Sequence, residues 1–141
     1  MLRRILIPID GSANSYRGLE YAADLAKKYG AEVTLIHVIE QHVVAESFGP
    51  PRSLPESYYH ESEEYARKLT TERKEQLEGQ GIKVETVIAN GNPVVEILRA
   101  AKGFDLIVIG SRGLGRFEKL LLGSVSSGIL QHSHVPVLVV R

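Results

Sequence analysis

The sequence predicts an α/β fold: one open, parallel sheet of five strands in the order 3-2-1-4-5, with helices on both faces. Short apolar runs, typical of strands buried on both faces, alternate along the chain with segments whose apolar residues have helical spacing. The first and fourth runs, Arg3–Ile9 and Phe104–Ile109, are the most apolar, which favours the centre of the sheet for them. A chain of 141 residues fits a single domain, 1–141.

The first strand and helix have clear signals. Arg3–Ile9 is a short apolar run that stops at Asp10. The next apolar residues recur at spacings of three and four and predict one buried helix stripe: Leu19, Ala22, Ala23 and Ala26. Gly30 is a natural helix end. Val33–Ile39 is nearly continuously apolar and predicts a second buried strand.

The middle of the chain is more polar. Segment 41–57 contains three prolines and is long for a connection, which is typical of a lid, an interaction element or a mobile segment. Residues 58–80 predict a long surface helix with a loose apolar stripe: Tyr58, Tyr65, Ala66, Leu69 and Leu77. Ile82–Ile88 alternates partly with a period of two, which indicates a less buried strand at an edge of the sheet.

The last third contains two helices and two strands. Asn92 and Pro93 are a capping residue and a first-turn proline for a helix. Its apolar stripe is Val94, Ile97, Leu98 and Ala101. Phe104–Ile109 and Val135–Val140 predict the fourth and fifth strands. The helix expected between them, Ser124–His132, has Val125, Ile129 and Leu130 as candidate inward residues.

Composition excludes several classes of function. The chain has 17 basic and 17 acidic residues, so nucleic acid is not expected as its main partner. It has no cysteine, which excludes disulfides, thiolate metal ligands and thiol nucleophiles. No apolar stretch reaches the roughly 20 residues that span a bilayer, and we expect a cytoplasmic protein without a membrane partner. His132 and His134 fit no metal-ligand pattern, and His37 is expected to be a hydrogen-bonded core residue.

The residues that point to chemistry follow the fourth strand. Two residues separate Gly110 from Gly113, and nine separate Gly113 from Gly123. Ligands of such sheets bind beyond the carboxyl ends of the strands where the winding reverses, here between strands one and four. Glycine lets backbone N–H groups approach a ligand and adopts the positive φ of a phosphate nest. A helix that begins Gly-Ser-Val-Ser-Ser presents unpaired N–H groups and hydroxyls to an anion. Taken singly, these residues also suit an ordinary turn and helix cap.

Taken together, the pattern Gly-x2-Gly-x9-Gly-Ser resembles the ATP-binding signature of the universal stress protein family. The resemblance extends to four other segments of the chain: Ile7–Ser12, Leu35–Val38, Gly91–Pro93 and Pro136–Arg141. It implies a single-domain member of that family, with the Rossmann-like fold of the adenine nucleotide alpha hydrolase group and with ATP as its ligand.

The resemblance also implies a set of ATP-binding residues. Pro8, Asp10 and Val38 would lie at the base of the pocket, Ile109 and Gly110 near the adenosine, and Gly113, Gly123, Ser124 and Val125 along the phosphates. The Asp10 carboxylate can accept hydrogen bonds from a sugar or base, and its alternative role is to cap the first helix. Arg112 and Arg116 can pair with phosphate oxygens or remain in solvent. Mg²⁺ is expected to accompany the triphosphate, bound mainly by phosphate oxygens and water.

The last strand suggests a partner. Val135–Val140 is continuously apolar and is expected at a sheet edge. Because soluble proteins protect or pair such edges, we expect a homodimer through antiparallel pairing of Val137–Val140 across a two-fold axis, in agreement with the resemblance.

Three functions fit the predicted fold. The first is a nucleotide-dependent stress-response or signalling module, in which ATP orders the loop from Ser111 to Leu122 and segment 41–57. The second is a slow ATPase or a phosphoryl or nucleotidyl transferase that uses the same pocket. It is disfavoured because the sequence has neither a P-loop Gly-Lys-Ser/Thr nor an evident base, and no catalytic residue is assigned. The third, a phosphorylated receiver domain, requires an acidic residue and a lysine where the chain has Ala89-Asn90 and Arg141.

Overall fold

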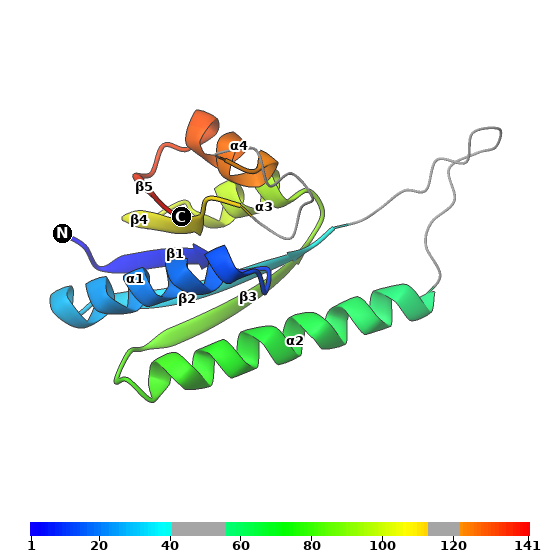
Figure 1. Ribbon diagram of the computed structural model, residues 1–141, viewed down its shortest axis with the longest axis horizontal. Coiled ribbons are helices and arrows are strands. Elements are labelled where there is room, and N and C mark those ends of the chain that lie inside the picture. Colours follow the sequence, from blue (N-terminus) through cyan, green and yellow to red (C-terminus); the bar gives the residue numbers. More distant parts are fainter. Residues whose placement is uncertain (41–55, 113–121) are drawn as a thin grey trace.

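The five strands form one parallel sheet in the order β3-β2-β1-β4-β5, which confirms the predicted topology (Figure 1). The computed structural model describes residues 1–40, 56–112 and 122–141. The elements in chain order are β1 (Arg4–Pro8), α1 (Ala13–Tyr29), β2 (Glu32–Ile39), α2 (Glu56–Glu78), β3 (Val84–Asn90), α3 (Pro93–Ala100), β4 (Leu106–Gly110), α4 (Ser124–His132) and β5 (Val137–Val140). Of the predicted segment 41–57, residues 41–55 lie outside the described part, and α2 already includes Glu56 and Ser57.

Local sequence signals set several helix ends. The Ser12 hydroxyl caps α1 by accepting a hydrogen bond from the Ser15 N–H at 3.1 Å. Gly30 ends the helix with a φ of 66°, the left-handed conformation that glycine adopts without strain. The Asn92 side chain accepts a bond from the Val95 N–H at 3.2 Å, and Pro93 is the first residue of α3. The predicted ends at Gly30 and Asn92 are therefore confirmed.

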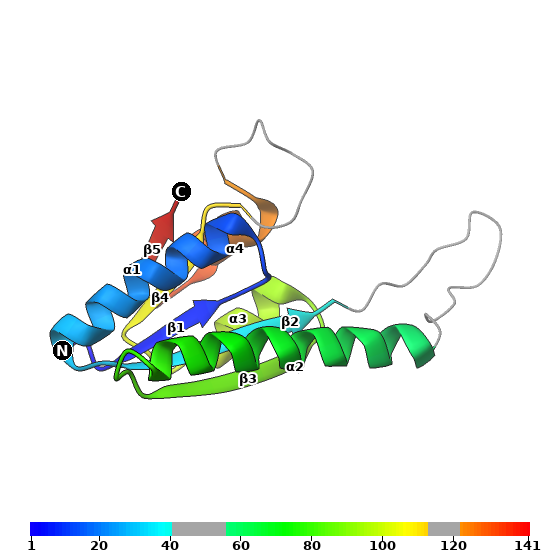
Figure 2. The same cartoon turned by 60° about the horizontal axis from the view of Figure 1, so that its bottom comes forward.

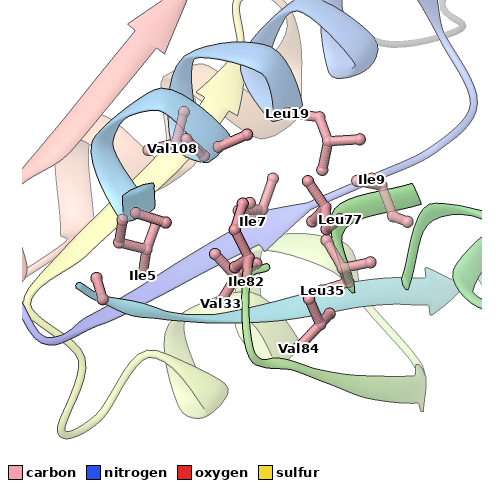
Figure 3. Close-up of a cluster of buried hydrophobic side chains, with 14 of the residues drawn as sticks. Ile5, Ile7, Ile9, Leu19, Val33, Leu35, Leu77, Ile82, Val84 and Val108 are labelled. Atoms are coloured by element: carbon pink, nitrogen blue, oxygen red, sulfur yellow. The ribbon is translucent and has the colours of Figure 1, made fainter. Parts of the chain in front are cut away.

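Helices cover the sheet on both faces, α1 and α2 on one and α3 and α4 on the other (Figures 1 and 2). The central strand β1 shows why: Ile5 and Ile7 belong to the apolar cluster under α1 and α2, whereas Leu6 belongs to the cluster under α3 and α4. Figure 3 shows the first cluster, to which Leu19 of α1 and Leu77 of α2 also contribute. All five of these side chains are at most 2 % exposed, so burial fixes the position of β1.

The two edges of the sheet differ in burial. β3 is one edge, and from Glu85 to Ile88 all of its residues are exposed, as its partly alternating sequence predicted. β5 is the other edge, where Val140 is buried and Val137, Leu138 and Val139 are half-buried. The expected edge positions of both strands are confirmed.

Two predicted apolar stripes need correction. In α4, Ile129 is fully buried, but Leu130 is 41 % exposed and the predicted inward position is wrong. Ser126 takes its place at 2 % exposure, because residues three apart share a helix face and Leu130 is rotated by about 100° from Ile129. In α2, Ala66, Leu69 and Leu77 are buried, whereas Tyr65 is 49 % exposed.

Among the described residues, no helix combines the length and the apolar character that crossing a bilayer requires.

Candidate functional site

The candidate site lies at the carboxyl ends of β1 and β4, the two central strands between which the winding reverses. Ile5 of β1 pairs with Leu106 of β4, and Leu6 pairs with Ile107, so the two parallel strands lie side by side with their carboxyl ends on the same side of the sheet. The helix that follows β1, α1, and the helix that follows β4 after the loop, α4, lie on opposite faces of the sheet. This is the topological switch point at which open α/β sheets bind ligands.

Ser111, the first residue after β4, holds several elements together. Its backbone N–H donates to the Val140 carbonyl of β5 at 2.7 Å. Its own carbonyl accepts two hydrogen bonds of 2.7 Å, one from the Gly123 N–H and one from the Ser126 hydroxyl. The Asn14 side-chain amide of α1 lies 3.5 Å from the Ser111 hydroxyl. The two ends of the loop between β4 and α4 are therefore hydrogen-bonded to each other.

The first turn of α4 carries backbone donors that the helix itself does not use. Gly123 is its N-cap, with φ of −72° and ψ of 169°, and has no side chain with which to cap the helix. The first intrahelical bond runs from the Ser127 N–H to the Gly123 carbonyl at 2.9 Å. Helix geometry leaves the N–H groups of Ser124, Val125 and Ser126 without an intrahelical acceptor. Ser124 is exposed and Val125 half-buried, so this turn combines donors, a hydroxyl and the positive end of the helix dipole.

Gly110 packs closely against α1 and does not have the positive φ that a phosphate nest requires. Positive φ angles among the described glycines occur at five other positions, and both Gly110 and Gly123 have negative φ, so the nest conformation is wrong for these two. A Cβ on Gly110 would lie 2.7 Å from the Asn14 carbonyl carbon and 2.9 Å from the Ser15 nitrogen. The glycine is needed here because the first turn of α1 packs directly against the end of β4.

Asp10 follows β1, and its carboxylate, its N–H and its carbonyl each form a hydrogen bond. Its carboxylate accepts a bond from the Ser12 N–H at 2.9 Å, its own N–H donates to the Ser15 hydroxyl at 3.3 Å, and its carbonyl accepts the Tyr65 hydroxyl at 3.3 Å. The alternative role of Asp10 as the cap of the first helix is wrong, because Ser12 occupies that position. The half-buried Asp10 is instead part of a local turn at the end of β1.

His37 and Tyr65 support this turn from the side of α2. The His37 Nδ1 donates to the Ile9 carbonyl at 2.8 Å, which confirms the expected hydrogen bond, although the side chain is half-buried rather than buried. The rings of His37 and Tyr65 meet edge to face, with centroids 5.9 Å apart.

The other predicted site residues that the structure describes lie near the carboxyl ends of the strands, and two lie outside the described part. Pro8 and Ile109 are buried near the ends of β1 and β4, Val38 is half-buried near the end of β2, and Arg112 is exposed beside Ser111. Gly113 lies outside the described residues, as does Arg116, and so do 113–121 of the loop from Ser111 to Leu122.

Two residues of the site were missed by sequence reasoning. Ser111 and Ser126 are only 1 % and 2 % exposed, yet both are polar and lie within or beside the recognised glycine pattern. A serine at the third helical position after a glycine cap was the available signal for Ser126, because side chains of the first turn can bond nearby carbonyls. Nothing local distinguished Ser111.

Among the side chains that the structure describes, in residues 1–40, 62–112 and 122–141, no group of three His, Asp or Glu could hold a metal ion. The donors at the site are backbone N–H groups and hydroxyls, which suit an anion rather than a cation.

The sequence matches the family model described as the universal stress protein family over residues 1–141. The chain belongs to this family. Among its relatives, the universal stress protein YxiE of Bacillus subtilis is 38 % identical over 148 aligned positions, which cover all of both chains. The solved structure of MJ0577, a universal stress protein of Methanocaldococcus jannaschii, is 32 % identical with a TM-score of 0.73, and the alignment covers 99 % of this chain and 96 % of that one. A universal stress protein from Archaeoglobus fulgidus has been solved in complex with dAMP. Its structure aligns with this one over the full length of both chains, with a TM-score of 0.73. At 19 % identity it is a match of fold alone.

Proposed function

We propose that this universal stress protein is an ATP-binding regulatory module of the stress response, acting as one domain over 1–141 in the cytoplasm. The observation that carries the proposal is the first turn of α4, whose glycine cap leaves three backbone N–H groups for an outside acceptor at the switch point of the sheet. A polyphosphate supplies such acceptors and the negative charge that the helix dipole favours.

An adenine nucleotide is the proposed anion because of the family signature and the fold. The fold holds dAMP in the Archaeoglobus fulgidus protein, so it is compatible with this class of ligand. Pro8, Asp10 and Val38 would lie at the base of the pocket, with Ile109 and Gly110 near the adenosine. Gly113, Gly123, Ser124 and Val125 would line the phosphates, with Arg112 at their rim. Mg²⁺ would be carried by the phosphate oxygens.

Ser124 provides a test that separates binding from folding. It is the first residue of α4 and is exposed, so Ser124→Glu adds a negative charge where it stabilises a helix but repels a phosphate. We expect ATP affinity to fall by about tenfold or more, which corresponds to roughly 1.4 kcal/mol, with no loss of thermal stability. Ser124→Ala, which removes only the hydroxyl, is the matched control and should lose less.

The measurements are isothermal titration with ATP and chromatography of nucleotides released from the denatured, purified protein. Equal ATP binding by wild type and Ser124→Glu would refute the assigned position of the phosphates. A wild-type protein that binds no ATP would refute the proposed function. Rapid appearance of ADP after addition of Mg²⁺ and ATP would favour an enzyme over a regulatory module.

The proposed module is a homodimer through β5. The Pro136 carbonyl accepts the Ile107 N–H at 2.9 Å, and the Val140 carbonyl accepts the Ser111 N–H at 2.7 Å. Because successive residues of a strand direct their backbone groups to opposite sides, Val137 and Val139 direct theirs to the open edge. An antiparallel second copy of β5 would pair with these groups.

Val139→Pro tests the dimer, because it removes an N–H from the open edge and leaves the bonds to β4 in place. We expect sedimentation velocity to give a dimer for wild type and a folded monomer for Val139→Pro at tens of micromolar. Leu138→Pro, which removes a donor facing β4, should unfold the protein instead. A monomeric wild type, or a dimer that survives Val139→Pro, would rule out pairing through this edge.

A further inference from the structure

Ser126, in the first turn of α4, has a buried hydroxyl aimed away from the proposed ligand and toward the end of β4. We propose that Ser126 is a positioning residue for phosphate binding: its hydroxyl fixes the first turn of α4 to Ser111 and so aligns the unpaired N–H groups of that turn. This inference rests on the proposed ATP site and assigns a residue that acts on it without touching the nucleotide.

The geometry around Ser126 supports a fixed link. Its Oγ donates to the Ser111 carbonyl at 2.7 Å and lies 3.1 Å from the Gly123 carbonyl. Ser126 is 2 % exposed and Ser111 is 1 % exposed, so water does not compete for this bond. The acceptor is itself held, because the Ser111 N–H is bonded to Val140 of β5.

The link takes over a function that the helix cap lacks. An N-cap serine, threonine, asparagine or aspartate fixes the first turn by accepting a bond from the N–H of the second or third residue. Gly123 cannot do so, and a side-chain cap would occupy a donor that the ligand needs. Ser126 fixes the turn through its side chain and leaves its own backbone N–H unused. The first turn is thus rigid and still open to an anion.

Loss of the hydroxyl should act on the phosphates more than on the nucleoside. Without it, the hydrogen bond between described residues that still links the turn to the end of β4 is the one from the Gly123 N–H to the same Ser111 carbonyl. Ligand binding would then cost more conformational entropy, because the backbone donors of a looser turn must be ordered when the ligand binds. The residues proposed at the base of the pocket and near the adenosine lie on or just after β1, β2 and β4, and take no part in this bond.

The experiment compares the affinities of ATP and adenosine by equilibrium dialysis. For Ser126→Ala we expect ATP to bind at least about fivefold more weakly, the ratio that the loss of one ordinary hydrogen bond produces, and adenosine to bind within about twofold of wild type. Ser126→Thr, which keeps the hydroxyl, should restore ATP affinity. Circular dichroism and urea titration establish that each variant is folded.

Thr70→Val is the matched control. Thr70 is 3 % exposed, and its hydroxyl donates to the Ala66 carbonyl at 2.8 Å within α2, on the opposite face of the sheet from α4. Its loss should lower the urea midpoint and leave the ratio of ATP to adenosine affinity unchanged. ATP binding by Ser126→Ala at wild-type strength, or an equal loss of ATP and adenosine affinity, would overturn the inference while the proposed function stands. A wild type that binds no ATP would remove both.

Discussion

Gly110 and Gly18 face each other across the contact between β4 and α1, and alanine should have opposite effects at these two positions. A Cβ on Gly110 would lie 2.7 Å from the Asn14 carbonyl carbon and 2.8 Å from its oxygen. Carbon atoms in ordinary contact are about 3.5 to 4.0 Å apart, so α1 or β4 would have to move by about 1 Å. The atoms on both sides belong to the backbone, which cannot rotate away as a side chain does.

The magnitude follows from the cost of overpacking. Extra carbon atoms in a packed interior destabilise by about 1 to 3 kcal/mol, and we expect Gly110→Ala near the upper value. With a urea dependence of about 2 kcal/mol per molar, the midpoint of unfolding should fall by roughly 1 to 1.5 M. The measurement is urea unfolding followed by circular dichroism, with the protein concentration held constant because a dimer would make stability concentration-dependent.

Gly18→Ala is the control. A Cβ there would meet the Gly110 nitrogen at 3.6 Å and the Ile109 carbonyl carbon at 3.7 Å, which are ordinary contacts. Alanine in a helix interior is favoured over glycine by about 0.5 to 1 kcal/mol, so this variant should be more stable than wild type. If Gly110→Ala unfolds at the wild-type midpoint, or if Gly18→Ala is the more damaging of the two, the close approach of α1 to β4 does not limit the residue at 110.

Two further predictions concern other contacts of the fold. The Asp105 carboxylate accepts the backbone N–H groups of Arg3 and Arg4, both at 2.9 Å, and these bonds lower the pKa of Asp105. Its contribution to stability is therefore present above the unfolded pKa of about 4 and is lost as the pH falls through the lower folded pKa. Wild type should exceed Asp105→Asn in urea midpoint at pH 7, and the difference should shrink in acid; a difference that grows in acid would contradict this sign. A Cβ on Gly128 of α4 would lie 2.8 Å from a methyl of Val94, whose branched side chain has few alternative rotamers. Gly128→Ala should lower the thermal midpoint, and adding Val94→Ala should recover part of the loss; additive losses would exclude a steric conflict between α3 and α4.

The backbone arrangement of the site could be predicted from the sequence. The strand order brings Pro8, Gly110 and Gly123 to one edge of the sheet, and the order itself follows from the greater apolarity of the first and fourth strands. The glycine cap of α4 was visible as Gly-Ser-Val-Ser-Ser, because a helix start depends on adjacent residues. The side-chain links were not predictable, since the bond between Ser126 and Ser111 joins residues on two elements that meet only after folding.

By itself, the sequence determined the elements, their order in the sheet, the ends at Gly30 and Asn92, and the family. These depend on periodicity and on neighbours within one helical turn. Only the tertiary structure decided that Gly110 is required by the backbone of α1, that Ser126 rather than Leu130 is buried, and that Asp10 lies in a turn while Ser12 caps the helix. The physical reason is that close packing and burial of a polar group depend on atoms far apart in the chain, and a local pattern does not record which of them will meet.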